Sequence, residues 1–247
     1  MDILALPEKN FTRLRENNGT YSVSTKKIYK HKMDVTEYAS DCVEWAYNNV
    51  WGEGHLKPSG RDKSTTFKNA LTGKFGEFGL HRHFVNLGYN VPSPDLTIMP
   101  KGVWDDGDLF WEGKKISVKT TASWKDLLLL KKNEWDTDAG YLFGKDGIDY
   151  SYKAFFLCRL SPDLESLLSM IVGNNDPGID VIKSHLEQIR FTMDFPGFIT
   201  IDDFKRIIKT DMCIPAKGKI GKKEFDDALY YCQTGDLRDI DLIRKKR

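Results

Sequence analysis

The chain lacks several features that would assign it to a familiar class of protein. Its cysteines are few and widely spaced, with no CxxC pair, so neither a disulfide framework nor a zinc site is expected. No apolar run approaches the roughly 20 residues that a membrane-spanning helix needs. The N-terminal sequence MDILALPEKN has no basic-then-apolar signal pattern. We therefore expect a cytoplasmic protein that does not associate with membranes.

A strong charge of one sign is also missing. The net charge is +1, which argues against a generally basic nucleic-acid-binding protein but leaves room for a local basic cleft beside acidic metal ligands. The chain has no internal repeats and no low-complexity linker. The basic stretch at residues 214–223 lacks the GxxxxGK[ST] pattern of a phosphate-binding loop and is expected to be a solvated loop. These features predict a single domain over residues 1–247.

Hydrophobic periodicity predicts both helices and strands. Apolar residues recur at helical spacing over residues 34–49 and 64–87, and Gly88 ends the second helix. Residues 153–160 form an apolar core strand, whereas residues 127–130 fit either a buried strand or the inner turn of a helix. Shorter elements follow: a helix from residues 161–163 onward, a helix over 179–189, a strand over 198–201 and a helix over 202–208. Residues 1–33 are expected to be irregular. The fold class predicted is α/β (α+β), with a mixed central β-sheet flanked by helices.

Residues 104–121, with the sequence WDDGDLFWEGKKISVKTT, form the most informative stretch. They read as a strand over residues 108–111, a polar turn over residues 112–115 and a second strand over residues 116–120. Gly113 allows the positive φ that a tight turn requires. The stretch therefore predicts a β-hairpin, with the strand at 153–160 beside its second strand.

Apolar and polar residues alternate in the second strand of this hairpin. Ile116 and Val118 share one face, and Ser117 and Lys119 share the other. Pairing of the two strands brings Asp108 toward Lys119. An anionic metal ligand near a cationic side chain suits metal-assisted hydrolysis of a phosphodiester.

This arrangement resembles the PD-(D/E)XK nuclease superfamily, the fold of most Type II restriction endonucleases. The family pattern is an Asp that opens a strand, an acidic-X-Lys tripeptide on the next strand and often a Glu on the preceding helix. The corresponding residues are Asp108, Lys119 and, in GKFGEFG, Glu77. The acidic position holds Ser117, giving SVK. Some restriction enzymes of this superfamily have Ser there and recruit a Glu from elsewhere, for which Glu134 is the leading candidate.

The resemblance covers residues 73–160 and implies a restriction-endonuclease-like core at about residues 64–160, with elaborations at both ends. It implies that Lys119 activates the attacking water and that Ser117 positions a metal-bound water. The implied ligands of Mg²⁺ are the carboxylates of Asp108, Glu77 and Glu134 and the backbone carbonyl of Val118. The implied function is a Mg²⁺-dependent, sequence-specific endonuclease that cuts double-stranded DNA as a homodimer, leaves 5′-phosphate ends and shares its system with a cognate methyltransferase.

Several alternatives stay open. Asp95, in a literal Pro-Asp, rivals Asp108 as the metal-binding Asp; we prefer Asp108 because it leads directly into the hairpin. The glycines at 73, 76 and 79 indicate either close approach of another group to the second helix or a helix in two pieces. A repair, resolvase or transposition nuclease of the same fold remains possible, as does a non-catalytic DNA-binding protein in which Ser117 marks a decayed site.

Overall fold

The central element of the structure, a computed structural model, is a five-stranded mixed sheet with the order β3-β8-β7-β5-β4. The residues described are 6–27, 32–54, 56, 62–98, 109–142, 151–173 and 175–243. The strands are β3 (Met33–Asp34), β4 (Leu109–Trp111), β5 (Lys114–Ala122), β7 (Ala154–Ser161) and β8 (Thr192–Thr200). β5 and β7 are parallel, and the other neighbouring pairs are antiparallel. The structure therefore confirms the predicted mixed sheet with flanking helices. It also confirms that the strand predicted at residues 153–160 lies beside the second strand of the hairpin.

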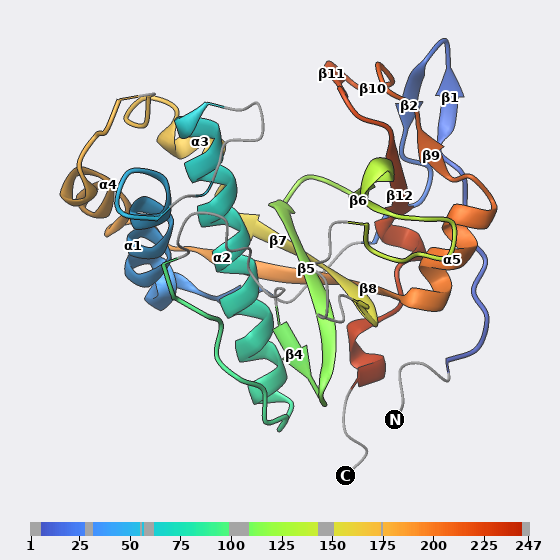
Figure 1. The fold of residues 1–247 in the computed structure, drawn as a ribbon, viewed down its shortest axis with the longest axis horizontal. Helices are drawn as coiled ribbons and strands as arrows, with labels where there is room; N and C mark the ends of the chain where they lie inside the picture. Colours follow the sequence, from blue (N-terminus) through green and yellow to red (C-terminus); the bar gives the residue numbers. More distant parts are fainter. Residues whose placement is uncertain are drawn as a thin grey trace.

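Helices of the described residues lie on one side of this sheet, and the longest of them packs directly against it (Figure 1). They are α1 (Ala39–Val50), α2 (Lys63–Asn86), α3 (Leu164–Leu168) and α4 (Ile179–Leu186). Their apolar stripes meet the sheet in one core, where Phe84 of α2 stacks on Trp111 and meets Phe156 edge to face. The Asp62 side chain caps α2 by accepting a hydrogen bond from the Thr65 amide. No helix in the described ranges combines the length and apolarity needed to cross a bilayer.

A second core lies against the other face of the sheet. α5 (Ile201–Lys209) packs there together with a three-stranded sheet of order β6-β12-β9, as Figure 1 shows. Its strands are β6 (Leu127–Lys131), β12 (Leu229–Gln233) and β9 (Cys213–Ile214). The ambiguous apolar run at residues 127–130 is thus a strand, paired antiparallel with β12. The described residues also form short 3₁₀ helices: η2 (Thr36–Tyr38), η3 (Lys132–Glu134), η4 (Thr234–Asp236) and η5 (Ile240–Ile243).

The prediction that the first 33 residues are irregular was wrong in part. β1 (Arg15–Asn17) and β2 (Thr20–Ser22) form a hairpin around Asn18 and Gly19, which have φ values of 48° and 75°. An Asn-Gly pair is a strong sequence signal for such a turn. The hairpin pairs in parallel with β10 (Lys219–Ile220), and β10 pairs with β11 (Lys223–Glu224). The basic stretch expected as a loop therefore contributes strands to a four-stranded sheet.

The glycines of α2 are explained by close packing within an uninterrupted helix. A Cβ at Gly76 would lie 1.7 Å from Thr120 Oγ1 on β5, and one at Gly79 would lie 2.3 Å from Met193 Sδ on β8. A Cβ at Gly73 would meet nothing within 4 Å. Two of the three glycines therefore allow side chains of the sheet to approach the helix backbone.

Alanine at Gly76 is expected to lower the free energy of unfolding by about 1–3 kcal/mol, because the new methyl group overlaps Thr120 in a packed interface. The matched change Gly73→Ala should raise it by up to about 1 kcal/mol, because alanine is the better helix former. Urea unfolding of the two variants measures both values. Equal stability of the two variants would contradict the close packing at Gly76.

Candidate active site

The predicted hairpin is present and is tighter than expected. β4 and β5 pair antiparallel, with Leu109 opposite Ile116. The turn consists of Glu112 and Gly113 alone, with φ values of 48° and 70°, and it confirms the positive φ predicted for the glycine. Asp108 lies outside the described residues, and its successor Leu109 is the first residue of β4.

The two faces of β5 have different surroundings. Val118 lies in the core beneath the helices, and Thr120 lies against the α2 backbone at Gly76. Side chains alternate along a strand, so Ser117 and Lys119 point to the opposite face. Their register partners on β7, Phe155 and Leu157, point to the same opposite face, because both belong to the second core. Lys119 and Ser117 thus share a face, as predicted, and it is the face away from α2.

Lys119 is partly buried in β5, whereas Ser117 is only 2% exposed. Within the part of the chain that the structure describes, the Lys119 ammonium has no hydrogen-bond or ion-pair partner. An ammonium in contact with solvent is a compact point charge that binds phosphate groups. The position and chemistry of Lys119 therefore suit an anionic ligand.

Glu77 has a partner of its own on α2. Its Oε2 accepts a hydrogen bond of 2.6 Å from Lys74 Nζ, and the Lys74 side chain is fully buried. The same ammonium lies 4.0 Å from the ring centre of Trp45 on α1. A metal ion bound by Glu77 would compete with Lys74, and loss of the carboxylate would leave a buried ammonium poorly compensated. Glu77 faces α1, so the structure does not bring it together with Lys119.

Asp95 belongs to the same cluster as Glu77. Its backbone carbonyl accepts a hydrogen bond of 2.8 Å from Lys74 Nζ. Its carboxylate accepts hydrogen bonds from the hydroxyl and the amide of Thr97, which hold the pKa of Asp95 below its ordinary value. Trp45 closes the cluster by donating from Nε1 to the Thr97 carbonyl at 3.1 Å. The rival Asp is thus placed with Glu77, on the helical side of the sheet.

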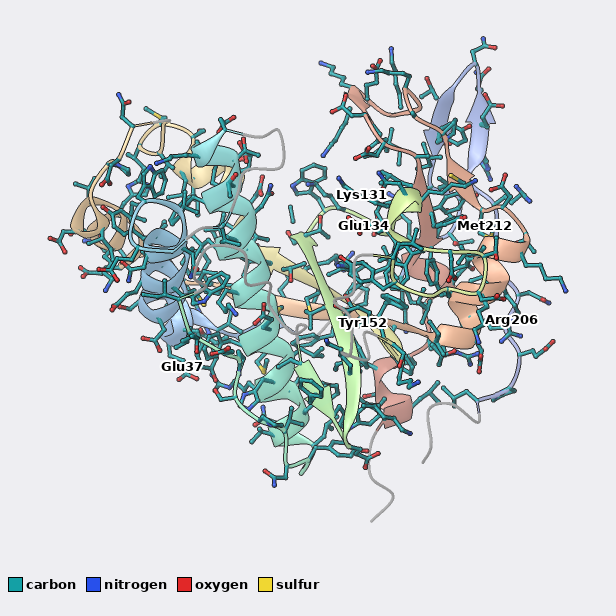
Figure 2. All side chains as sticks on the ribbon, in the orientation of Figure 1. Glu37, Lys131, Glu134, Tyr152, Arg206 and Met212 are labelled. Atoms are coloured by element: carbon teal, nitrogen blue, oxygen red, sulfur yellow. The ribbon has the colours of Figure 1, made fainter. Side chains whose placement is uncertain are left out.

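Glu134 lies on the other side. Glu134 is the last residue of η3, which directly follows β6. In Figure 2, Glu134 and α2 lie on opposite sides of the central sheet. Its neighbour Trp135 packs edge to face on Phe155, with ring centres 5.2 Å apart, and Phe155 is the register partner of Ser117. Glu134 and Lys119 therefore occupy the same side of the sheet, as the proposed replacement of the missing acid requires.

A buried polar network on this side escaped the sequence analysis. Arg159 of β7 lies beside Thr121 of β5. Its Nε lies 2.8 Å from Asp194 Oδ1, and its Nη1 lies 3.0 Å from Asp126 Oδ1. The sequence did contain a signal for this network, namely an arginine within the apolar strand sequence KAFFLCRL. A buried arginine needs a carboxylate partner, so the strand predicts a buried ion pair. The network extends the polar side of β5 toward the end of the strand.

The described residues fit Mg²⁺ only in part. No group of three or more His, Cys, Asp or Glu side chains in the described ranges could share a metal ion. Mg²⁺ usually needs only one or two carboxylates and keeps several waters. Glu134 offers one carboxylate on the side of Lys119, and Asp108, the expected second, is outside the described residues.

Comparisons of the chain with protein-family models, with curated proteins and with solved structures find no match.

Proposed function

We propose that the chain is a Mg²⁺-dependent, sequence-specific endonuclease for double-stranded DNA, of the Type II restriction class, with a restriction-endonuclease-like core. The observation that carries the proposal is the β4–β5 hairpin, which holds the SVK tripeptide with Lys119 and Ser117 on one face. Glu134 on the same side supplies an acid that the tripeptide lacks. Parallel pairing with β7 holds β5, the strand that carries Lys119, in place within the sheet.

In the proposed reaction, Lys119 orients the attacking water and stabilises negative charge that builds on the scissile phosphate. Asp108, Glu134 and the Val118 carbonyl would hold Mg²⁺, with Ser117 positioning one of its waters. Bound Mg²⁺ supplies Lewis-acid stabilisation of the phosphate oxygens. Hydrolysis leaves a 5′-phosphate and a 3′-hydroxyl. Glu77 is a ligand in this scheme only if it releases Lys74.

Cleavage of both strands at a palindromic site requires two active sites related by a twofold axis. The proposed assembly is therefore a homodimer on double-stranded DNA. Such an enzyme needs a cognate methyltransferase in the same system to protect host DNA, without physical contact between the two.

The experiment that tests this function is incubation of the purified protein with unmethylated phage DNA, with and without Mg²⁺, followed by gel electrophoresis. Discrete fragments that depend on Mg²⁺ support a sequence-specific endonuclease, and sequencing of their ends gives the site. A smear would instead indicate a repair, resolvase or transposition type of nuclease. Absence of both cleavage and DNA binding would overturn the proposal.

The choice between the two Asp residues is tested in the same assay. Asp108→Asn is expected to abolish cleavage, because it removes a carboxylate next to the hairpin. Asp95→Asn should leave most activity, because the Asp95 carboxylate lies in the Lys74 cluster on the helical side of the sheet. The reverse result would identify Asp95 as the metal ligand and place the reaction beside Glu77.

The second candidate function is DNA binding without catalysis. The ion pair of Glu77 with Lys74 favours it, because the helical carboxylate is already neutralised. Retained DNA binding without cleavage by the wild-type protein is the expected result for this candidate. Ser117→Asp, which restores an acid in the tripeptide, is then the variant to assay for recovered Mg²⁺-dependent cleavage.

A further inference from the structure

Trp124 is the most exposed tryptophan of the described residues, with a relative exposure of 68%. It follows β5, five residues after Lys119. At about 3.3 Å per residue, the Cα atoms of the two residues are at most about 17 Å apart. Figure 1 shows the chain crossing here from the tip of β5 to β6. A large aromatic ring in water thus lies near the proposed catalytic lysine.

The backbone around Trp124 is fixed, although its ring is exposed. The Ser123 amide donates to the Leu160 carbonyl at the end of β7, and the Lys125 amide donates to the Ala122 carbonyl, both at 3.0 Å. The next residue, Asp126, accepts a hydrogen bond from the Thr234 amide. An anchored loop that presents an aromatic side chain loses little conformational entropy when the ring is covered.

Two lysines lie at the loop that carries the ring. Lys125 Nζ lies 5.1 Å from the centre of the Trp124 ring. Lys26, 62% exposed, reaches the loop through an ion pair of 3.2 Å with Asp126. The Asp126 carboxylate is shared with buried Arg159, so it offsets only part of the local positive charge. An exposed aromatic ring with a lysine over it and a second lysine on the same loop is a combination that binds a nucleobase and its phosphates.

We propose that Trp124 stacks on a nucleobase of the bound DNA, at a step where the duplex is kinked or unpaired near the scissile phosphate. This inference rests on the proposed nuclease function and assigns part of its DNA contact. Insertion of an apolar side chain between base pairs separates a step and bends the duplex, which allows further contacts with the protein. Lys125 and Lys26 bind the flanking phosphates.

The test measures binding of the full-length protein to a fluorescently labelled linear fragment of phage DNA by anisotropy, with Ca²⁺ in place of Mg²⁺. Trp124→Ala should weaken binding by roughly 5- to 150-fold, the range for loss of one stacked base. The salt dependence of DNA binding by this variant should equal that of the wild type, because stacking releases no counterions. Lys125→Ala should instead lower the salt slope by about one unit. Trp124→Phe should retain most of the affinity but lose part of the DNA-induced quenching of tryptophan fluorescence.

Phe110→Ala is the matched control. Phe110 is 44% exposed, and Lys115 Nζ lies 6.0 Å from its ring centre, but it sits on β4 near the turn, at the other end of the hairpin. It should bind DNA like the wild type. Equal affinity of Trp124→Ala and the wild type would overturn the inference while the nuclease assay still supports the function. Failure of the wild type to bind or cut DNA would overturn both. Loss of self-association in Trp124→Ala, with DNA affinity unchanged, would instead make the ring a protein contact.

Discussion

Replacement of Lys119 by alanine is expected to lower the rate of Mg²⁺-dependent DNA cleavage by at least about 100-fold, the usual effect of removing one group that stabilises transition-state charge. The fold should survive, because Lys119 is partly exposed and forms no ion pair with the described residues. DNA binding in Ca²⁺ should fall little, because one lysine contributes one phosphate contact. Single-turnover cleavage and anisotropy measure the two effects separately.

Lys153→Ala is the matched control for Lys119→Ala. Lys153 precedes β7, and its ammonium donates a hydrogen bond of 3.2 Å to Ser151 Oγ, its one side-chain partner among the described residues. Removal of this charge should leave cleavage within a few-fold of the wild type. Normal cleavage by the Lys119 variant would remove the lysine, and with it the SVK tripeptide, from the proposed mechanism.

Replacement of Asp194 by alanine is expected to lower the free energy of unfolding by about 3–5 kcal/mol, the cost of breaking a buried ion pair by removing one partner. Asp194 accepts from both Nε and Nη2 of Arg159, and the two side chains are 3% and 8% exposed. Asp126 holds only Nη1 of the same guanidinium. A loss of this size is a large fraction of the total stability of an ordinary domain. The midpoint of urea unfolding measures it.

Glu44→Ala provides the comparison for Asp194→Ala. Glu44 forms an ion pair with Lys183 at the surface, where its side chain is 57% exposed, and its removal should cost less than about 1 kcal/mol. The loss of stability in Asp126→Ala should lie between those of the other two variants. This variant also provides a folded protein to measure if Asp194→Ala does not accumulate. A midpoint for Asp126→Ala equal to that of Glu44→Ala would contradict a structural role for the network.

The sequence was most informative where residues close in the chain determine the structure. Apolar periodicity predicted α2, β7 and the hairpin, because a stripe or an alternation specifies the face that must be buried. It could not decide residues 127–130, because a short apolar run fits either element; pairing with β12, about 100 residues later, makes them a strand. The β1–β2 turn was missed although Asn18 and Gly19 carried its signal.

The candidate site required information that no local pattern contains. The alternation in β5 predicted that Ser117 and Lys119 share a face, but it could not show that α2 covers the other one. The sequence placed Glu77 on the second helix without showing that Lys74 neutralises it. Partners of this kind depend on how helices and strands pack.

The pairing of the first hairpin with residues far along the chain has a consequence for synthesis on the ribosome. Gln233, fully buried, accepts a hydrogen bond from the Ser24 amide and donates to the Thr12 carbonyl, and these contacts join residues more than 200 positions apart. Such contacts form only after a large loss of chain entropy. The N-terminal segment must therefore wait, without these partners, until residue 233 has left the exit tunnel. Nascent chains that stop before β12 should expose this segment to proteases and chaperones.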